Sequence, residues 1–167
     1  MGNMADDDRL KVRGYDELPF SSIGAYPDLE RCYRAWLAAK GDRLAPSAVD
    51  VDDVPKSVLP YVMLLDYLPE ENDVEVRIAG NYVGERTTDE HGGRRLRDYF
   101  CDADAETVFA SMQRVATTGL PSLAARAYVT IEGREYSYVR IILPLSANGR
   151  TVTGFFKTIE PSSLDIR

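Results

Sequence analysis

The sequence predicts an α+β domain built on a single antiparallel sheet. Apolar residues recur with helical spacing near residue 30, two strand-like segments follow, and three more strand-like segments close the chain. The helical segments between the two groups of strands do not alternate with single strands, which is the alternation that produces a parallel sheet. The length of 167 residues fits one domain with its own core.

The N-terminal part is expected to be a tail followed by a helix. Residues 1–25 are rich in Asp, Gly and Ser, with only scattered apolar residues, so we expect a tail there. Helical periodicity begins after them, and one side of the helix carries Leu29, Tyr33, Trp36 and Leu37. Residues 45–60 are interrupted by Pro and Asp, which predicts an irregular connector.

The middle of the chain predicts a hairpin and then helices. A nearly continuous apolar run at 62–68, bounded by prolines, predicts a strand buried on both faces, and the alternation over 74–79 predicts its half-buried partner. Short helices are expected over 82–89 and 96–100. A longer helix over 104–118 is indicated by apolar residues at i, i+3, i+4 and i+7.

The last third predicts three strands, over 122–132, 135–146 and 151–159. They are rich in Tyr, Val, Ile and Phe. Gly133-Arg134 and Asn148-Gly149 connect them, and Asn-Gly is the strongest short hairpin signal.

Two-residue loops would fix the register of these strands, with Thr130 opposite Ser137 and Leu145 opposite Val152. One face is then aliphatic at its centre, is assigned to the core beneath the long helix, and carries Arg126, Tyr128, Thr130, Val139, Ile141, Leu143, Leu145, Val152, Gly154 and Phe156. The other face is apolar and aromatic, is expected to be covered by the N-terminal helix, and carries Ala125, Ala127, Val129, Tyr136, Tyr138, Arg140, Ile142, Phe155, Lys157 and Ile159. A slip of one residue would swap the two faces.

Composition and charge argue against several classes of function. The net charge of −7 disfavours a nucleic-acid partner, because duplex binding needs a basic face. No stretch reaches the ~20 apolar residues of a membrane span, and the N-terminus lacks the features of a signal peptide, so we expect a cytoplasmic protein. Cys32, Cys101 and the single histidine, His91, are too few for a disulfide framework or for the usual metal sites.

The sequence also lacks the common catalytic motifs. A hydrolase triad, a P-loop and a dinucleotide-binding loop are absent, so we do not expect an enzyme. Asp66 is the exception among the carboxylates, because it lies within a strongly apolar strand where it could act as a general base. The alternative is that Asp66 lies near the strand end and accepts a hydrogen bond from a loop.

Several short motifs, in this order and spacing, resemble a small group of single-domain bacterial PAS proteins. The resemblance extends from about residue 29 to residue 160. It rests on YRAWL at 33–37, VLPY at 58–61, VRIAG at 76–80, LRDYF at 96–100 and RIILPL at 140–145.

The resemblance implies a PAS fold with a five-stranded antiparallel sheet of order 2-1-5-4-3. Helices would cover one face, and the N-terminal helix would cover the other. The PAS domain would span 26–160, divided into a helix and connector (26–60) and a core (61–160), with a C-terminal tail at 161–167.

The function that the resemblance implies is a signalling or regulatory module that binds a protein partner, such as a sensor histidine kinase, and forms a homodimer. No output domain is expected after Ile159, so the signal would pass through that partner, which could bring the protein to a membrane. Flavin and haem are not expected, because no Asn-Cys-Arg-Phe-like segment follows Asn81 and the helix over 104–118 contains no histidine.

Two sets of residues are expected to carry this function. A small apolar ligand would lie in a cavity between sheet and helices, lined by Arg126, Tyr128, Val139, Ile141, Phe156, Met112, Val115 and Ile78. The interface would consist of Leu29, Tyr33, Trp36, Leu37, Tyr136, Tyr138 and Phe155. The alternatives are a small pocket enzyme that uses Asp66 as its base, a ligand-free structural dimer, and an Arg126 that pairs with an acid such as Glu106.

Overall fold

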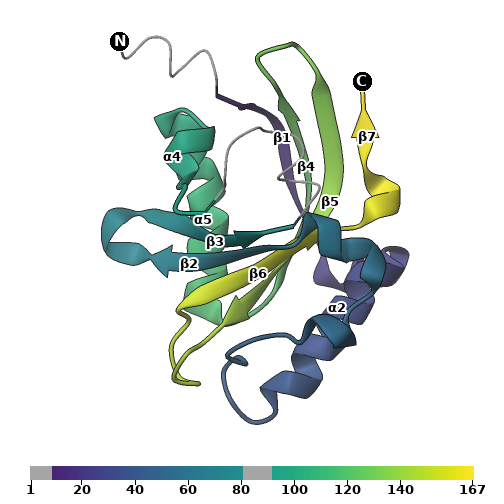
Figure 1. Cartoon of the computed structure of the whole chain (residues 1–167), viewed down its shortest axis with the longest axis vertical. Coiled ribbons are helices and arrows are strands. Elements are labelled where there is room, and N and C mark those ends of the chain that lie inside the picture. The colour runs from purple at the N-terminus through teal and green to yellow at the C-terminus, as the bar shows by residue number, and fades with distance from the viewer. Residues whose placement is uncertain (1–8, 81–91) are drawn as a thin grey trace.

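The computed structural model describes residues 9–80 and 92–167, which form one curved sheet with helices on both faces (Figure 1). The short helix expected over 82–89, together with Asn81 and His91, lies outside the described residues.

The N-terminal segment joins the sheet, which corrects the tail expected over 1–25. Its described part contains strand β1 (Lys11–Leu18) and the 3-10 helix η1 (Phe20–Ala25), which leads into helix α2 (Pro27–Lys40). Val12 donates its backbone N–H to the Asp104 carboxylate at 3.0 Å, so β1 is held beside the start of the long helix. Alternation in β1 is weak, because Gly14, Asp16 and Glu17 interrupt it.

The middle of the chain largely follows the prediction. The connector contains η2 (Val51–Asp53) and η3 (Lys56–Tyr61), and the hairpin contains β2 (Met63–Leu68), η4 (Pro69–Glu71) and β3 (Asp73–Ala79). The helices are α4 (Leu96–Tyr99) and α5 (Asp102–Thr118). Gly80 is required where β3 ends against η3, because a Cβ there would lie 2.4 Å from two backbone carbonyl oxygens.

The C-terminal strands complete a larger sheet than expected. They are β4 (Ser122–Val129), β5 (Glu135–Leu145), β6 (Gly154–Ile159) and β7 (Asp165–Ile166), with η5 (Pro161–Ser163) before the last. The order β4-β5-β6-β2-β3 confirms the expected five-strand order. Strand β1 extends the sheet beyond β4, and β7 pairs with β5. The tail expected over 161–167 is therefore also corrected.

The registers differ from those predicted, because neither hairpin has a two-residue loop. Residues 130–134 form the first loop, which Gly133 closes in a left-handed conformation (φ 82°), so Ser137 pairs with Ala127 instead of Thr130. In the second loop the Asn148 side chain accepts backbone N–H groups from Arg150 and Thr151 (2.8 and 2.9 Å), and Leu145 pairs with Gly154. The β4–β5 pairing differs from the prediction by an odd number of residues, so the side chains of β4 change face relative to those of β5. The β5–β6 pairing differs by an even number, so its side chains keep their relative faces.

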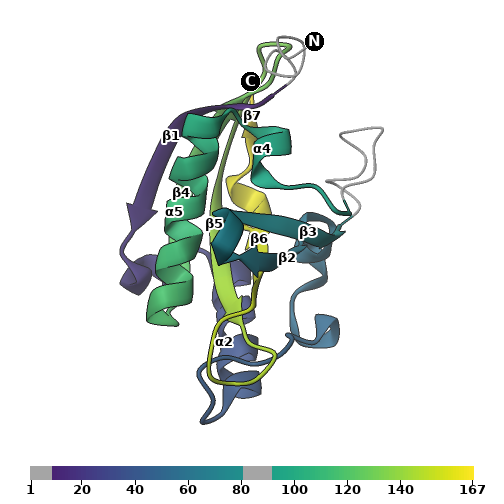
Figure 2. The same cartoon turned by 90° about the vertical axis from the view of Figure 1, so that its left-hand side faces the viewer.

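The two faces of β5 and β6 are consequently swapped. The aliphatic face packs under α2 rather than under α5, and its central residues are Val139, Ile141, Leu143, Leu145 and Phe156. Ile142 and Phe155 instead pack with α5, together with Val108, Phe109 and Met112. Figure 2 shows α2 and α5 on opposite sides of the sheet. On the α2 side the connector adds Val49, Val54 and Val58 to the core, so α2 and the connector together bury the aliphatic face.

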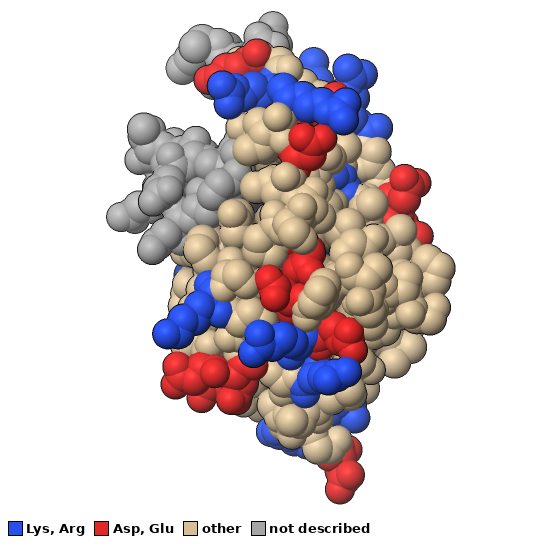
Figure 3. Space-filling model, turned by 90° about the vertical axis from the view of Figure 1, so that its right-hand side faces the viewer, with Lys and Arg blue, Asp and Glu red and all other residues tan. Residues whose placement is uncertain are grey.

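The surface carries both signs of charge. Figure 3 shows basic and acidic side chains interspersed over one side of the molecule, with uncharged areas between them. Of the described helices, none has the length and apolar character needed to cross a membrane.

Candidate functional site

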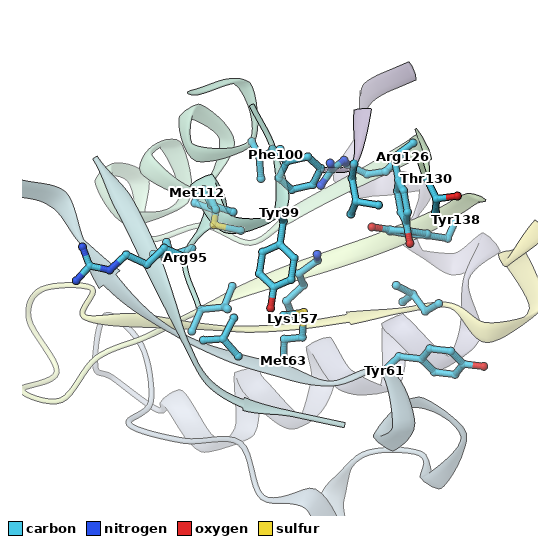
Figure 4. A pocket seen from close by; sticks show the side chains of 18 of the residues that line it. Tyr61, Met63, Arg95, Tyr99, Phe100, Met112, Arg126, Thr130, Tyr138 and Lys157 are labelled. Carbon is cyan, nitrogen blue, oxygen red and sulfur yellow. The ribbon is translucent and has the colours of Figure 1, made fainter. Parts of the chain in front are cut away.

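A cavity of about 240 Å3 lies between the sheet and the helices α4 and α5 (Figure 4). All five strands of the PAS order contribute to it, together with both helices and the segments next to β1 and β7. Its apolar wall consists of Leu10, Met63, Leu65, Val74, Val76, Leu96, Phe100, Val108, Met112, Ile159 and Leu164. Its polar lining consists of Tyr61, Arg95, Tyr99, Arg126, Tyr128, Thr130, Tyr138 and Lys157.

Arg126 is the most deeply buried charged group of this lining, with 3 % of its surface exposed. Its guanidinium lies 5.0 Å from the Tyr15 ring centre and 5.9 Å from that of Phe100, so aromatic faces hold it on both sides. Its Nε and Nη2 atoms are buried without a hydrogen-bond partner in the described part of the chain. The expected pairing with Glu106 is wrong, because no described carboxylate forms an ion pair with Arg126.

Lys157 and Tyr138 lie close enough to Arg126 to interact with it electrostatically. Burial is the main cause that lowers the pKa of Lys157; Arg126 and Arg140 act in the same direction, and Tyr138 opposes them. Burial alone would raise the pKa of Tyr138, but the positive charges of Lys157, Arg126 and Arg140 together lower it. The shifts show that positive charge accumulates at this wall of the cavity.

Arg95, the third cation of the lining, is already neutralised. Its guanidinium is 2.8 Å from a Glu71 carboxylate oxygen and 3.5 Å from one of Glu75, and it points away from the cavity in Figure 4. No carboxylate is among the described residues that line the cavity. Arg126 and Lys157 are therefore basic side chains in a cavity whose described lining holds no carboxylate to pair with them.

Arg140 supports the site from behind. It is fully buried and donates to the Ser122 carbonyl (3.1 Å) and hydroxyl (2.9 Å) and to the Tyr15 hydroxyl. Glu17 lies 3.7 Å away and supplies the counter-charge. Tyr15 thus contacts both Arg140 and Arg126, which ties β1 to the cavity wall.

The structure places three of the eight expected ligand-binding residues in the cavity lining: Arg126, Tyr128 and Met112. Val139, Ile141 and Phe156 lie on the opposite face of the sheet, under α2. Val115 is buried in the α5 cluster outside the lining, and Ile78 is 56 % exposed. The misplaced residues of β5 and β6 follow from the β4–β5 register, which differs from the predicted one by an odd number of residues.

The expected interface set is divided between the two faces. Four of these residues belong to α2 itself. Leu29 and Trp36 are buried against the sheet, and the Trp36 indole N–H donates to the Pro144 carbonyl at 2.8 Å. Tyr33 is half-buried and Leu37 is exposed. Tyr138 instead lines the cavity and Phe155 belongs to the α5 core. Tyr136 stacks on Tyr128 at 5.4 Å. These residues therefore do not form one continuous outer surface.

Besides Arg95, four polar residues of the lining were not expected there from the sequence: Lys157, Tyr138, Tyr99 and Tyr61. Lys157 is a cation within an otherwise apolar strand, which is the same signal that singled out Arg126. Burial raises the pKa of Tyr99 to about 12, with smaller effects from Arg94 and Asp98, so its hydroxyl is a neutral hydrogen-bonding group at the cavity.

Asp66 does not lie at this cavity. Its side chain is 44 % exposed and sits 3.8 Å from the Arg77 guanidinium, on the far face of the hairpin. The interpretation of Asp66 as a buried general base is wrong for that reason. Among the described residues, no group of three His, Cys, Asp or Glu side chains is placed to hold a metal ion.

Comparison with known proteins identifies the family. A match to the PAS domain family spans residues 26–157, which is most of the chain and includes the connector, the sheet hairpins and α5. No curated protein and no solved structure matches the chain. With the strand order and the family match in agreement, the chain belongs to the PAS domain family.

Proposed function

We propose that this PAS domain is a sensory module whose input is a small molecule bound between the sheet and α4–α5. The observation that carries the proposal is Arg126, whose Nε and Nη2 atoms are buried at the cavity without an acceptor among the described residues. Buried polar groups are almost always hydrogen-bonded, so these donors suit an acceptor that arrives with a ligand. A mostly apolar cavity with a few convergent polar groups is also the usual construction of a small-molecule site.

Mass spectrometry of material released from the purified protein tests this proposal. We expect denaturation of the purified wild type to release a small molecule. If none is released, we expect the protein to bind at least one of three probes: octanoate, octan-1-ol or octylamine. Val108→Phe should abolish binding, because the larger side chain projects into the cavity. Val115→Phe makes the same change on the same helix outside the lining and should bind as the wild type does. No release and no binding of any of the three probes would contradict the proposal and favour a ligand-free structural dimer.

We also propose that the domain passes its state to a regulatory protein such as a sensor histidine kinase, and that it forms a homodimer. Family membership supports both, because PAS domains are typically regulatory and often mediate protein–protein contacts. The exposed side of α2 is the candidate surface, since Leu37 retains 42 % of its exposure there. We propose a cytoplasmic location for the module, with a membrane-bound partner able to recruit it.

Leu37→Asp tests the surface without removing a buried side chain, unlike Trp36→Ala. We expect it to weaken homodimerisation in analytical ultracentrifugation and to reduce recovery of a histidine kinase that the wild-type bait recovers. Leu120→Asp introduces the same charge at another exposed leucine (64 % exposed) and should change neither result. Equal behaviour of the two variants would exclude this surface of α2.

A further inference from the structure

The charge of the cavity carries an inference about the chemistry of its ligand, which rests on the proposed sensory function. Arg126 and Lys157 both line the cavity, and neither forms an ion pair with a described carboxylate. Arg140 lies near Arg126 at the Tyr15 ring, and Glu17 at 3.7 Å supplies its counter-charge. This accumulation occurs in a protein whose net charge is −7, so it is not a general feature of the molecule.

One end of the cavity is more polar than the other. Figure 4 shows Arg126, Thr130 and Tyr138 grouped at one end, Lys157 near the middle, and Met112 toward the other end. The apolar wall continues through Leu65, Val74 and Val76 of the hairpin. The volume of about 240 Å3 lies just below the ~300–1,000 Å3 of most small-molecule pockets, so the site suits a compact molecule.

We propose that the cavity binds an organic anion with an apolar body, a carboxylate of about the size of octanoate. The carboxylate would accept hydrogen bonds from Arg126, whose planar guanidinium can donate two to one carboxylate, and would be attracted by Lys157. The Tyr138 and Thr130 hydroxyls lie at the same end as further donors. The hydrocarbon body would cover the wall made by the hairpin, Leu96 and Met112.

Ligands of other charge fit this lining less well. A cation would enter a space that already holds two basic side chains, neither paired with a described carboxylate, and would be repelled. A neutral ligand of the same shape would leave the buried guanidinium with weaker acceptors, and hydrogen bonds to charged partners are roughly twice as strong as neutral ones. The relative affinities of an anionic, a neutral and a cationic probe of equal size therefore test whether the cavity prefers an anion.

Isothermal titration calorimetry with four probes tests it: octanoate, octan-1-ol, octylamine and acetate. We expect octanoate to bind roughly 10-fold or more tighter than octan-1-ol, and octylamine to bind more weakly than both. Acetate should bind more weakly than octanoate, because it lacks the apolar body. Arg126→Gln should weaken octanoate binding by roughly 10- to 100-fold while octan-1-ol binding changes little.

Two further variants keep the test interpretable. Lys157→Met should also reduce the preference for octanoate, which matters if Arg126→Gln fails to fold. Arg77→Gln removes one positive charge from the far face of β3, where its guanidinium faces Asp66, and should leave all four affinities unchanged. Equal binding of octanoate and octan-1-ol, or an unchanged preference in both cavity variants, would overturn the anion inference while the sensory proposal stands. Failure of all four probes, with no molecule released from the purified protein, would count against both.

Discussion

The Glu160 carboxyl illustrates how one buried acid couples the sheet to α2. Its Oε1 accepts the Asp28 backbone N–H at 3.1 Å, near the N-terminus of α2, while its Oε2 is buried without a partner in the described part of the chain. Burial raises the pKa of Glu160 above 4.5; the Asp28 N–H lowers it slightly and the Asp28 charge raises it. The folded protein therefore binds this proton more tightly than the unfolded chain does.

Glu160→Gln should reveal this linkage. The wild type loses stability as the pH rises from 4.5 through the raised pKa, because the folded state then holds an ionised carboxylate that burial disfavours. Gln cannot ionise and can still accept the Asp28 N–H. We expect the variant to gain free energy of unfolding relative to wild type as the pH rises from 4.5 to 7, measured by urea denaturation. Glu70→Gln, at an exposed position, should show no such trend. If the free energy of unfolding of Glu160→Gln falls relative to that of the wild type between pH 4.5 and 7, the account is contradicted.

Cys32 should be inert in the folded protein. It is fully buried on α2, and burial, with smaller contributions from Asp28 and Glu160, raises its pKa to about 12. The nucleophilic thiolate is therefore scarce as well as inaccessible at pH 8. We expect N-ethylmaleimide to label only the partly exposed Cys101 in the native protein and both thiols in urea. Rapid native labelling of Cys32 would mean that α2 leaves the sheet readily.

At the scale of elements, β1 depends on the Arg140 cluster. Tyr15 accepts a hydrogen bond from the fully buried Arg140 guanidinium, and its ring also contacts Arg126. Tyr15→Phe keeps the ring but removes this acceptor, which should lower the free energy of unfolding by about 1–3 kcal/mol. Tyr33→Phe is the matched control: the Tyr33 ring stacks near Trp36 at 6.0 Å, and no described group bonds its hydroxyl. Equal urea midpoints for the two variants would contradict the role of Tyr15.

The strands of the PAS order and the helices α2 and α5 were predictable from the sequence, but β1, β7 and the strand registers were not. Periodicity identified α2, α5 and the strands of the PAS order, because each buries a regular set of apolar residues. Gly133-Arg134 and Asn148-Gly149 both suggested two-residue turns, yet Thr130 and Asn148 use their side chains to close longer loops. Both faces of β5 are apolar, so hydrophobicity alone could not decide which one lies under α5.

The site was predictable only in part, for the same physical reason. Arg126 and Tyr128 were identified because polar groups stand out on an apolar strand, and they line the cavity. Lys157 gives an equal signal, but the incorrect register placed it on the other face. The contribution of Leu10 depends on β1, whose sequence lacks clear alternation, so no local pattern could indicate it.

At the scale of the whole molecule, the two sides of the sheet have different roles. The α2 side is packed with aliphatic and aromatic side chains, and Trp36 of α2 donates a hydrogen bond to the Pro144 carbonyl of β5. The α5 side contains the cavity with Arg126 and Lys157, and no described carboxylate lines it. This difference between the two sides is why our proposal of a small-molecule input rests on the cavity rather than on α2.

Methyl NMR of the methionines tests this central claim most directly. Of the four methionines, Met63 and Met112 line the cavity from β2 and α5. The protein would carry 13C-labelled methionine methyl groups, assigned with Met63→Leu and Met112→Leu, and would be titrated with octanoate, octan-1-ol and octylamine. We predict that at least one probe shifts the Met63 and Met112 resonances together and saturably. Binding that leaves both resonances unchanged, or no binding by any probe, would contradict a small-molecule site in this cavity.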